Sequence, residues 1–255
     1  MALSTFAGNA VLDALLNNVA LQKTPYCSLH SADPALTGAS ELSGNGYARV
    51  AVTFDVPDGD GDTQNTAAVT FGPASADWTA ATYFGLWDQL AVGGNFLGGA
   101  ALDTPRTVLN GQYAEFAIGV EDIVGATQFG NTTLDNIVNA LFRNTALQVA
   151  QAYATLHTAD PGGTGASELP DLESYARVAL SFAAAASKAC ANDVQTDFAA
   201  AGGDGWAEVT HLGLWTLGTY GGGTFLWGKQ LTVPRIVTVG KFFRIAVGGV
   251  NVNVA

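Results

Sequence analysis

A long series of sequence motifs occurs twice in this chain, and this duplication limits the folds that the chain can adopt. Residues 29–34 read Leu-His-Ser-Ala-Asp-Pro and residues 156–161 read Leu-His-Thr-Ala-Asp-Pro; each run is followed by a loop containing Thr-Gly-Ala-Ser-Glu-Leu. The offset is 127 residues there and 128 between Tyr47 and Tyr175. Solenoid repeats have periods of roughly 20–50 residues. Each copy is therefore expected to be a whole domain with its own core, the first spanning 1–125 and the second 126–255.

Each copy begins with a helical pattern and continues with short strands. Apolar residues recur at steps of three and four over 11–21, where Asn9 is a suitable N-cap, and over 134–142, where Thr132 and Asp135 resemble a capping box. Segments of alternating polarity follow, separated by Gly, Pro, Asn and Asp. Because no helix lies between them, they should pair antiparallel. We expect a mainly β fold: two tandem antiparallel β-sandwich or β-barrel domains, each preceded by a short amphipathic helix.

Two further expectations concern strands in the first copy and a divergent segment in the second. Separate strands are predicted at 95–101 and 106–109 in the first copy, because polarity alternates in each. Residues 182–191 are rich in alanine and differ most from their counterpart, the acidic loop at 58–62. This divergence predicts a loop with few packing contacts.

The acidic loop partly matches a calcium-binding pattern. Asp58, Asp60 and Asp62 agree with its first three positions, but Thr63 stands where Gly is needed and Val69 where a bidentate Glu is needed. A solvated acidic hairpin is the simpler interpretation, and we expect no metal site here.

The charge content excludes some classes of partner. The net charge is −12 with only 10 Lys and Arg, so a nucleic-acid backbone would be repelled. Charged residues make up 13% of the chain against roughly 25% in ordinary domains, which favours a homo-oligomer or another partner covering apolar surface. The first residues lack a basic signal-peptide leader, and the longest helical apolar stretch is too short to cross a bilayer. We expect a protein made in the cytoplasm, without membrane contact.

Histidine and aspartate recur as a pair in both copies. His30 with Asp33, and His157 with Asp160, are candidates for contact residues or metal ligands. A metal site usually needs three or four ligands, and no third one recurs nearby in both copies. The simpler interpretation is a strand end whose His meets a backbone carbonyl while Asp-Pro forms a turn.

No pattern typical of catalysis or cofactor binding is found. Glu41 and Glu168 lack a second carboxylate at matching distance, and there is no G-x-S-x-G elbow, phosphate-binding loop or H-E-x-x-H helix. The sequence predicts no catalytic, cofactor-binding or metal-binding residues, and a protein that is not an enzyme.

The tryptophans suggest one kind of ligand. Trp87 and Trp215 fall within strands and should pack in a core. Trp78 and Trp206 fall in loops and are candidates for exposed contacts, for example with carbohydrate.

The ordered series of motifs resembles a known family. After the helix and the duplicated runs come Tyr-Ala-Arg-Val at 47–50, Val-Thr-Phe-Gly-Pro-Ala at 69–74, Phe-Gly-Leu-Trp-Asp at 84–88 and Thr-Pro-Arg-Thr-Val at 104–108. This series is similar to small virion proteins of tailed bacteriophages, often labelled tail fibre or minor structural proteins. The resemblance implies a non-catalytic virion component.

From this resemblance we expect an outer-surface capsid decoration or cement protein; a tail or tail-fibre attachment component, with carbohydrate bound in host recognition, is the alternative. The implied partners are the major capsid protein or tail proteins. The implied location is the virion, after synthesis in the bacterial cytoplasm.

Overall fold

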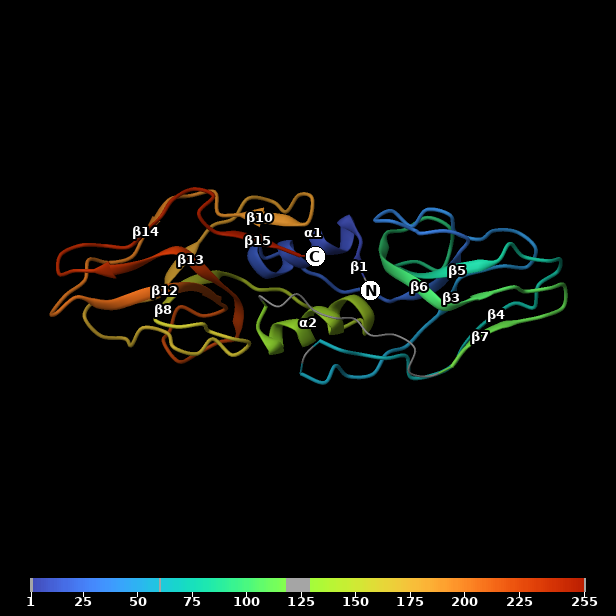
Figure 1. Cartoon of the computed structure of the whole chain (residues 1–255), viewed down its shortest axis with the longest axis horizontal. Helices are drawn as coiled ribbons and strands as arrows, with labels where there is room; N and C mark the ends of the chain where they lie inside the picture. The colour runs from blue at the N-terminus through green and yellow to red at the C-terminus, as the bar shows by residue number, and fades with distance from the viewer. Residues whose placement is uncertain (1, 60, 118–128, 255) are drawn as a thin grey trace.

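The computed structural model describes residues 2–59, 61–117 and 129–254. The expected boundary at 125/126, Asp60 and the end of the strand predicted over 113–120 lie outside the described residues. The molecule is elongated, with both helices at its centre and a β-rich body at either end (Figure 1).

The first repeat is built on an antiparallel five-stranded sheet of order β1-β6-β5-β2-β3, beside a two-stranded sheet, β4-β7. Its elements are β1 (Ala2–Leu3), α1 (Thr5–Leu16), β2 (Tyr26–His30), β3 (Val50–Ala51), β4 (Val69–Phe71), β5 (Ala81–Trp87), β6 (Phe96–Arg106) and β7 (Ala114–Phe116). Both sheets contribute side chains to the core.

The second repeat has the same plan, with sheets β13-β12-β8-β9 and β11-β14, and it adds a third sheet, β10-β15. Its elements are α2 (Asn131–Phe142), β8 (Ala152–His157), β9 (Val178–Leu180), β10 (Ala189–Ala191), β11 (Thr196–Asp197), β12 (Trp206–Trp215), β13 (Phe225–Val237), β14 (Arg244–Ile245) and β15 (Asn251–Asn253). The tandem, mainly β, sandwich-type architecture with leading helices is confirmed, and within the described residues no sheet closes into a barrel.

Three expectations about element boundaries and caps are wrong. The strands predicted on either side of Pro105 form one strand, β6, because its proline-containing half lies on an exposed sheet edge where no ladder donor is needed. Helix α1 begins at Thr5 rather than after Asn9, because Ser4 caps it by accepting a hydrogen bond from the Ala7 N–H. Helix α2 has Gly130 as its N-cap, so the predicted capping box is absent there.

The two repeats join through a reciprocal interface. Leu21 and Leu147 exchange backbone hydrogen bonds of 2.9 and 2.8 Å in an antiparallel bridge. The Lys23 N–H donates to the Ala140 carbonyl, and at an offset of 126 residues the Val149 N–H donates to Ala14. Each contact from the first repeat to the second is thus matched by a contact between the equivalent residues in the opposite direction, as across the isologous interface of a two-fold dimer.

Each helix also packs against a loop of the opposite repeat. In α1, Asn9 Oδ1 accepts the Lys188 N–H at 2.7 Å, and Asp13 Oδ1 accepts the Ala185 N–H at 2.9 Å. In α2, Asp135 Oδ1 accepts the N–H groups of residues 59 and 61, both at 3.2 Å. The expectation that residues 182–191 have few packing contacts is therefore wrong. Their divergence accompanies a new hairpin that receives α1.

The buried side chains form one cluster that includes both helices and both β-rich bodies. Phe142 of α2, for example, packs on Phe54 of the first repeat with ring centroids 5.6 Å apart. The repeats therefore share a core at their junction rather than holding two isolated ones.

Candidate functional site

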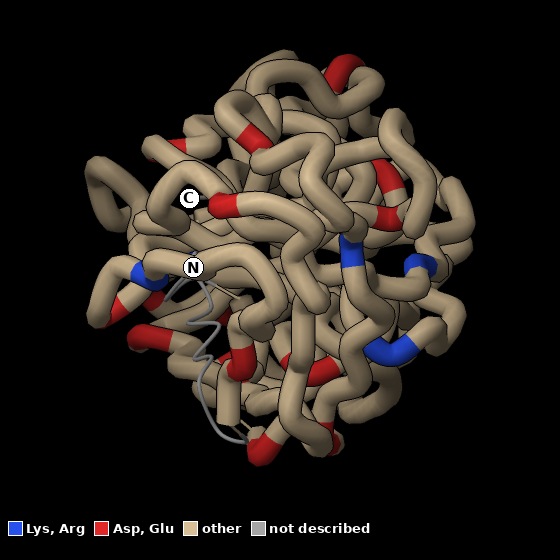
Figure 2. The backbone as a smooth tube through the Cα atoms, turned by 90° about the vertical axis from the view of Figure 1, so that its right-hand side faces the viewer, with Lys and Arg blue, Asp and Glu red and all other residues tan. Residues whose placement is uncertain are grey.

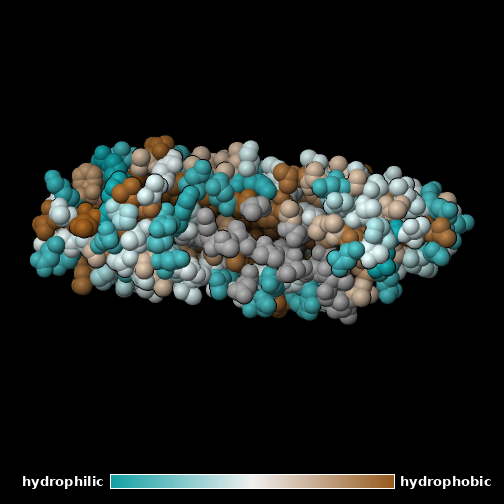
Figure 3. All heavy atoms as spheres, in the orientation of Figure 1, coloured by the Kyte–Doolittle hydropathy of each residue, from teal (hydrophilic) through white to brown (hydrophobic). Residues whose placement is uncertain are grey.

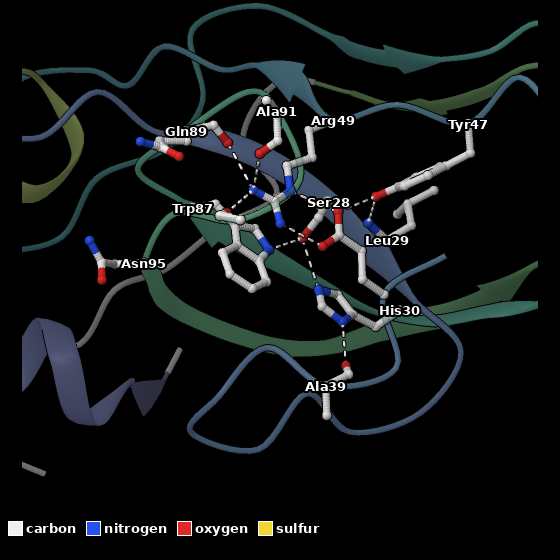
Figure 4. Close-up of polar contacts among 12 residues, drawn as sticks. Ser28, Leu29, His30, Ala39, Tyr47, Arg49, Trp87, Gln89, Ala91 and Asn95 are labelled. Atoms are coloured by element: carbon white, nitrogen blue, oxygen red, sulfur yellow. Dashed lines mark hydrogen bonds and ion pairs between the residues drawn. The ribbon is translucent and has the colours of Figure 1, made fainter. Parts of the chain in front are cut away.

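A chain of hydrogen bonds between buried side chains runs through the first repeat (Figure 4). His30, at the end of β2, is 0% exposed; its Nε2 lies 2.8 Å from Ser28 Oγ and its Nδ1 lies 2.7 Å from the Ala39 carbonyl oxygen. Trp87 Nε1 donates to the same Ser28 Oγ at 3.0 Å. Gly85 pairs with Ser28 across the sheet, and a Cβ there would lie 2.6 Å from His30 Nε2. The glycine therefore leaves room for the imidazole.

An ion pair lies beside this chain. The Arg49 guanidinium donates to Glu41 through two bonds, Nη2–Oε2 at 2.7 Å and Nε–Oε1 at 2.8 Å. Its Nη1 also donates to three carbonyl oxygens of the loop 89–93, and its Cζ lies over the Trp87 ring, 3.8 Å from the ring centroid. Arg49 thereby anchors that loop to the sheet. Bidentate pairs of this kind are geometrically specific as well as strong.

Tyr47 completes the cluster. Its hydroxyl accepts the Leu29 N–H at 2.9 Å and donates to Glu41 Oε1 at 3.3 Å. Burial, and more weakly the charge of Glu41, raises the pKa of Tyr47 far above its usual range, so the phenol stays protonated.

The second repeat contains the same arrangement. His157 Nε2 lies 2.9 Å from Thr155 Oγ1, and its Nδ1 lies 2.7 Å from the Ala166 carbonyl oxygen. Arg177 pairs with Glu168 at 2.7 Å. The shared motifs therefore converge on one buried network in each copy.

The copies differ at an arginine and at a tryptophan. Arg177 Nη1 donates to two loop carbonyl oxygens, where Arg49 Nη1 donates to three. Trp215 Nε1, the counterpart of the Trp87 donor, has no hydrogen-bond partner among the described residues. Thr155 stands where the first repeat has Ser28. A buried donor without a partner costs about 1–3 kcal/mol, so the second network is less completely satisfied.

The histidines are held in their neutral form. Burial lowers the pKa of His30 and of His157, although the hydrogen bond to a backbone carbonyl and the nearby glutamate oppose this shift. Because a carbonyl oxygen only accepts, Nδ1 carries the proton and Nε2 accepts from the hydroxyl. The Ser28–His30 hydrogen bond resembles part of a hydrolase triad, in which a serine hydroxyl also donates to an imidazole, but both residues are fully buried. A substrate has no access to this pair.

The histidine and the aspartate of each predicted His–Asp pair are hydrogen-bonded to other groups rather than acting together. Asp33 and Asp160 are exposed and accept the N–H groups of Ala35 and Gly162 at 2.8 and 2.9 Å, which makes them turn residues. The histidine nitrogens are engaged elsewhere, so neither His–Asp pair is arranged as metal ligands. No cluster of three or more His, Cys, Asp or Glu suited to a metal is found in the described part of the chain. The prediction that His30 and His157 are exposed contact residues is wrong, because both are buried in the sheet.

The expectation of exposed loop tryptophans is also wrong. Trp78 and Trp206 are only 7% and 6% exposed. Trp78 Nε1 donates to the Asn45 carbonyl at 2.8 Å, and Trp206 Nε1 donates to the Glu173 carbonyl at 3.0 Å. Their rings are buried edge-to-face against tyrosines, so neither offers an open stacking platform. Trp87 is buried in a strand, as predicted.

Sequence reasoning missed the two arginines. Arg49 organises the network of the first repeat and Arg177 that of the second. The sequence feature that indicates them is the recurrence of Tyr-Ala-Arg-Val after Ser-Glu-Leu. The partners of Glu41 and Glu168 are these cations rather than a second carboxylate.

The surface carries few charges. Seen from the end formed by the first repeat, acidic residues outnumber basic ones and most of the tube is uncharged (Figure 2). Neither described helix has the length and apolar character needed to span a membrane.

These features define a duplicated β-rich structural module whose shared polar residues serve packing. The chain belongs to the family described as "Podophage GP4 fiber I protein gp80", whose model matches residues 2–123 and again 128–253. No curated protein matches the chain. The predicted resemblance to phage fibre and structural proteins, in tandem copies, is therefore confirmed, and the chain has a phage structural role.

Proposed function

We propose that this protein is a non-catalytic component of a phage fibre, held in the virion by contacts with other virion proteins. The observation that carries the proposal is the family match over both repeats. The structure supports it because the polar residues common to the copies are buried and mutually bonded, as expected of a rigid building block.

The outer end of the second repeat is the proposed contact surface. Val233, Ile236 and Val239 are more than half exposed, on and just after β13, and their counterparts 129 residues earlier are two threonines and an asparagine. Hydrophobic residues gather at this end of the molecule, the left end in Figure 3. Apolar surface of this kind is typical of protein–protein contacts. We propose that another virion protein or a second copy of the chain covers it.

A capsid decoration or cement role is the second candidate. It is favoured by the charge-poor, acidic composition, with a net charge of −12, which suits the outside of a particle rather than contact with packaged DNA. Both roles place the protein in the virion and differ in where it sits.

Antibody labelling of intact particles, and of separated heads and tails, tests the proposal. Label on the tail or its fibres is the expected result. Label confined to heads would replace the fibre role by the decoration role, and absence of the chain from purified particles would refute both.

A further inference from the structure

We propose that the first repeat contains a binding site for a single neutral sugar residue, in a surface cavity beside Trp78. The cavity has a volume of about 180 Å³ and is lined by residue 31, residues 41–43 and 45, and residues 77–79. This is about six times the volume that one water molecule takes in the liquid, and it is below the roughly 300–1,000 Å³ of pockets for drug-sized ligands. It therefore suits one sugar ring rather than an oligosaccharide.

The rim of the cavity offers hydrogen-bonding groups of the types that hydroxyls need. Ser43, Asn45, Asp77 and Thr79 are all exposed. The hydroxyls of Ser43 and Thr79 make no hydrogen bond within the described part of the chain. Each of them can donate and accept, as each sugar hydroxyl can.

Two of the rim residues are held in position by the fold. Asn45 Nδ2 donates to the Asp77 carbonyl oxygen at 3.1 Å, and Asp77 Oδ1 accepts the Asn110 N–H at 2.8 Å. These bonds leave Asn45 Oδ1 and Asp77 Oδ2 as acceptors for a ligand. Groups fixed before binding lose less conformational entropy when the ligand arrives.

Trp78 forms part of the floor rather than a stacking surface. Its ring is fixed by the Nε1–H bond to Asn45 and by an edge-to-face contact with Tyr47, at 5.5 Å between centroids. A ligand would touch the accessible edge of the indole, while its hydroxyls bind the rim. This mode differs from stacking on an open aromatic face.

The charges favour a neutral ligand. Glu41 is paired with Arg49 through two bonds, so its charge is compensated. Asp77 forms none of the ion pairs found among the described residues, and the chain carries a net charge of −12. An anionic sugar would meet uncompensated negative charge at the rim.

The second repeat serves as an internal comparison. Trp206 uses the Glu173 carbonyl where Trp78 uses that of the asparagine, which aligns the two loops. The counterparts of Ser43, Asp77 and Thr79 are a proline, a glycine and an alanine. The second repeat keeps polar residues at the positions of Ser31, Glu41 and Asn45, but it lacks the three polar side chains that Ser43, Asp77 and Thr79 supply to the rim.

This inference adds a ligand to the proposed fibre role and rests on that role for its biological setting. The test uses the full chain labelled with 5-fluorotryptophan, whose resonances are assigned with single Trp→Phe variants. The probes are glucose, galactose, rhamnose and N-acetylglucosamine, with glucuronic acid as the anionic comparison. We expect saturation transfer to at least one neutral sugar, a shift of the Trp78 resonance, and a Kd on the order of 1 mM.

The double variant Ser43→Ala/Thr79→Ala should bind about tenfold more weakly, because two hydrogen bonds are lost. Thr232→Ala/Thr238→Ala, which removes two exposed hydroxyls from the second repeat, should bind as the unmodified chain does. Absence of transfer to every neutral probe, stronger binding of glucuronic acid, or binding unchanged in the first double variant would overturn the inference. None of these results bears on whether antibody labels the fibres, so the two proposals fail separately.

Discussion

Removing Arg49 is the sharpest test of the buried network. Its side chain is 3% exposed, donates twice to Glu41 and donates to three carbonyl oxygens of the loop 89–93. Removing one partner of a buried ion pair costs about 3–5 kcal/mol, because the other charge is left uncompensated. We therefore expect Arg49→Ala to lower the free energy of unfolding by about 4 kcal/mol. For a chain of this size that is a decrease in Tm of about 8–16 °C.

Urea unfolding at 25 °C, followed by tryptophan fluorescence and far-UV circular dichroism, measures this loss. Arg106→Ala is the matched control: that arginine is exposed and its Cζ lies 5.7 Å from the centroid of the Phe116 ring, so the change should alter stability by no more than about 0.5 kcal/mol. Replacing both partners, as Arg49→Met with Glu41→Leu, should cost less than Arg49→Ala alone. A loss below about 1 kcal/mol for Arg49→Ala would refute the assigned role.

Three further predictions follow from the same structure. Burial holds the pKa of His30 and His157 below the usual value of about 6.5, so the unfolded chain binds more protons in acid than the folded chain does. The free energy of unfolding should therefore be level above about pH 6.5 and decrease below it. A His30→Gln/His157→Gln variant should show a weaker decrease in urea titrations across that range. Gly85→Ala should cost about 1–3 kcal/mol because its Cβ meets the imidazole, whereas Gly222→Ala, with 3.5 Å of clearance, should cost far less; equal losses in thermal unfolding would contradict this reasoning. Phe142→Ala should cost about 3–5 kcal/mol and destabilise both repeats together, since the core is shared; two separate calorimetric transitions would argue against it.

Much of the architecture was predictable from local patterns. A period of 127–128 residues indicated two equivalent units, helical spacing indicated one helix before each, and alternating segments between turn residues indicated antiparallel strands. These features depend on neighbours within a few residues, or on direct comparison of the copies. The errors at α1 and β6 arose where a nearer cap, Ser4, and an exposed sheet edge at Pro105 outweighed the pattern.

The candidate site was less predictable, because its geometry depends on residues distant in sequence. The Asp-Pro turns and the carbonyl partner of His30 were anticipated from local chemistry. The bond from Trp87 to Ser28 spans 59 residues, and no pattern in the chain indicates it. The burial of Trp78 depends likewise on the separate loop that supplies Asn45.

The sequence by itself determined that this protein consists of two like β-rich units with leading helices, because the hydrophobic period and the turn residues are local properties. Only the tertiary structure decided that each helix packs on a loop of the other unit, that Arg49 and Arg177 neutralise Glu41 and Glu168, and that Trp78 lies beside a polar cavity of the first repeat. Those outcomes depend on which surfaces exclude water from one another, and that is a property of the assembled fold.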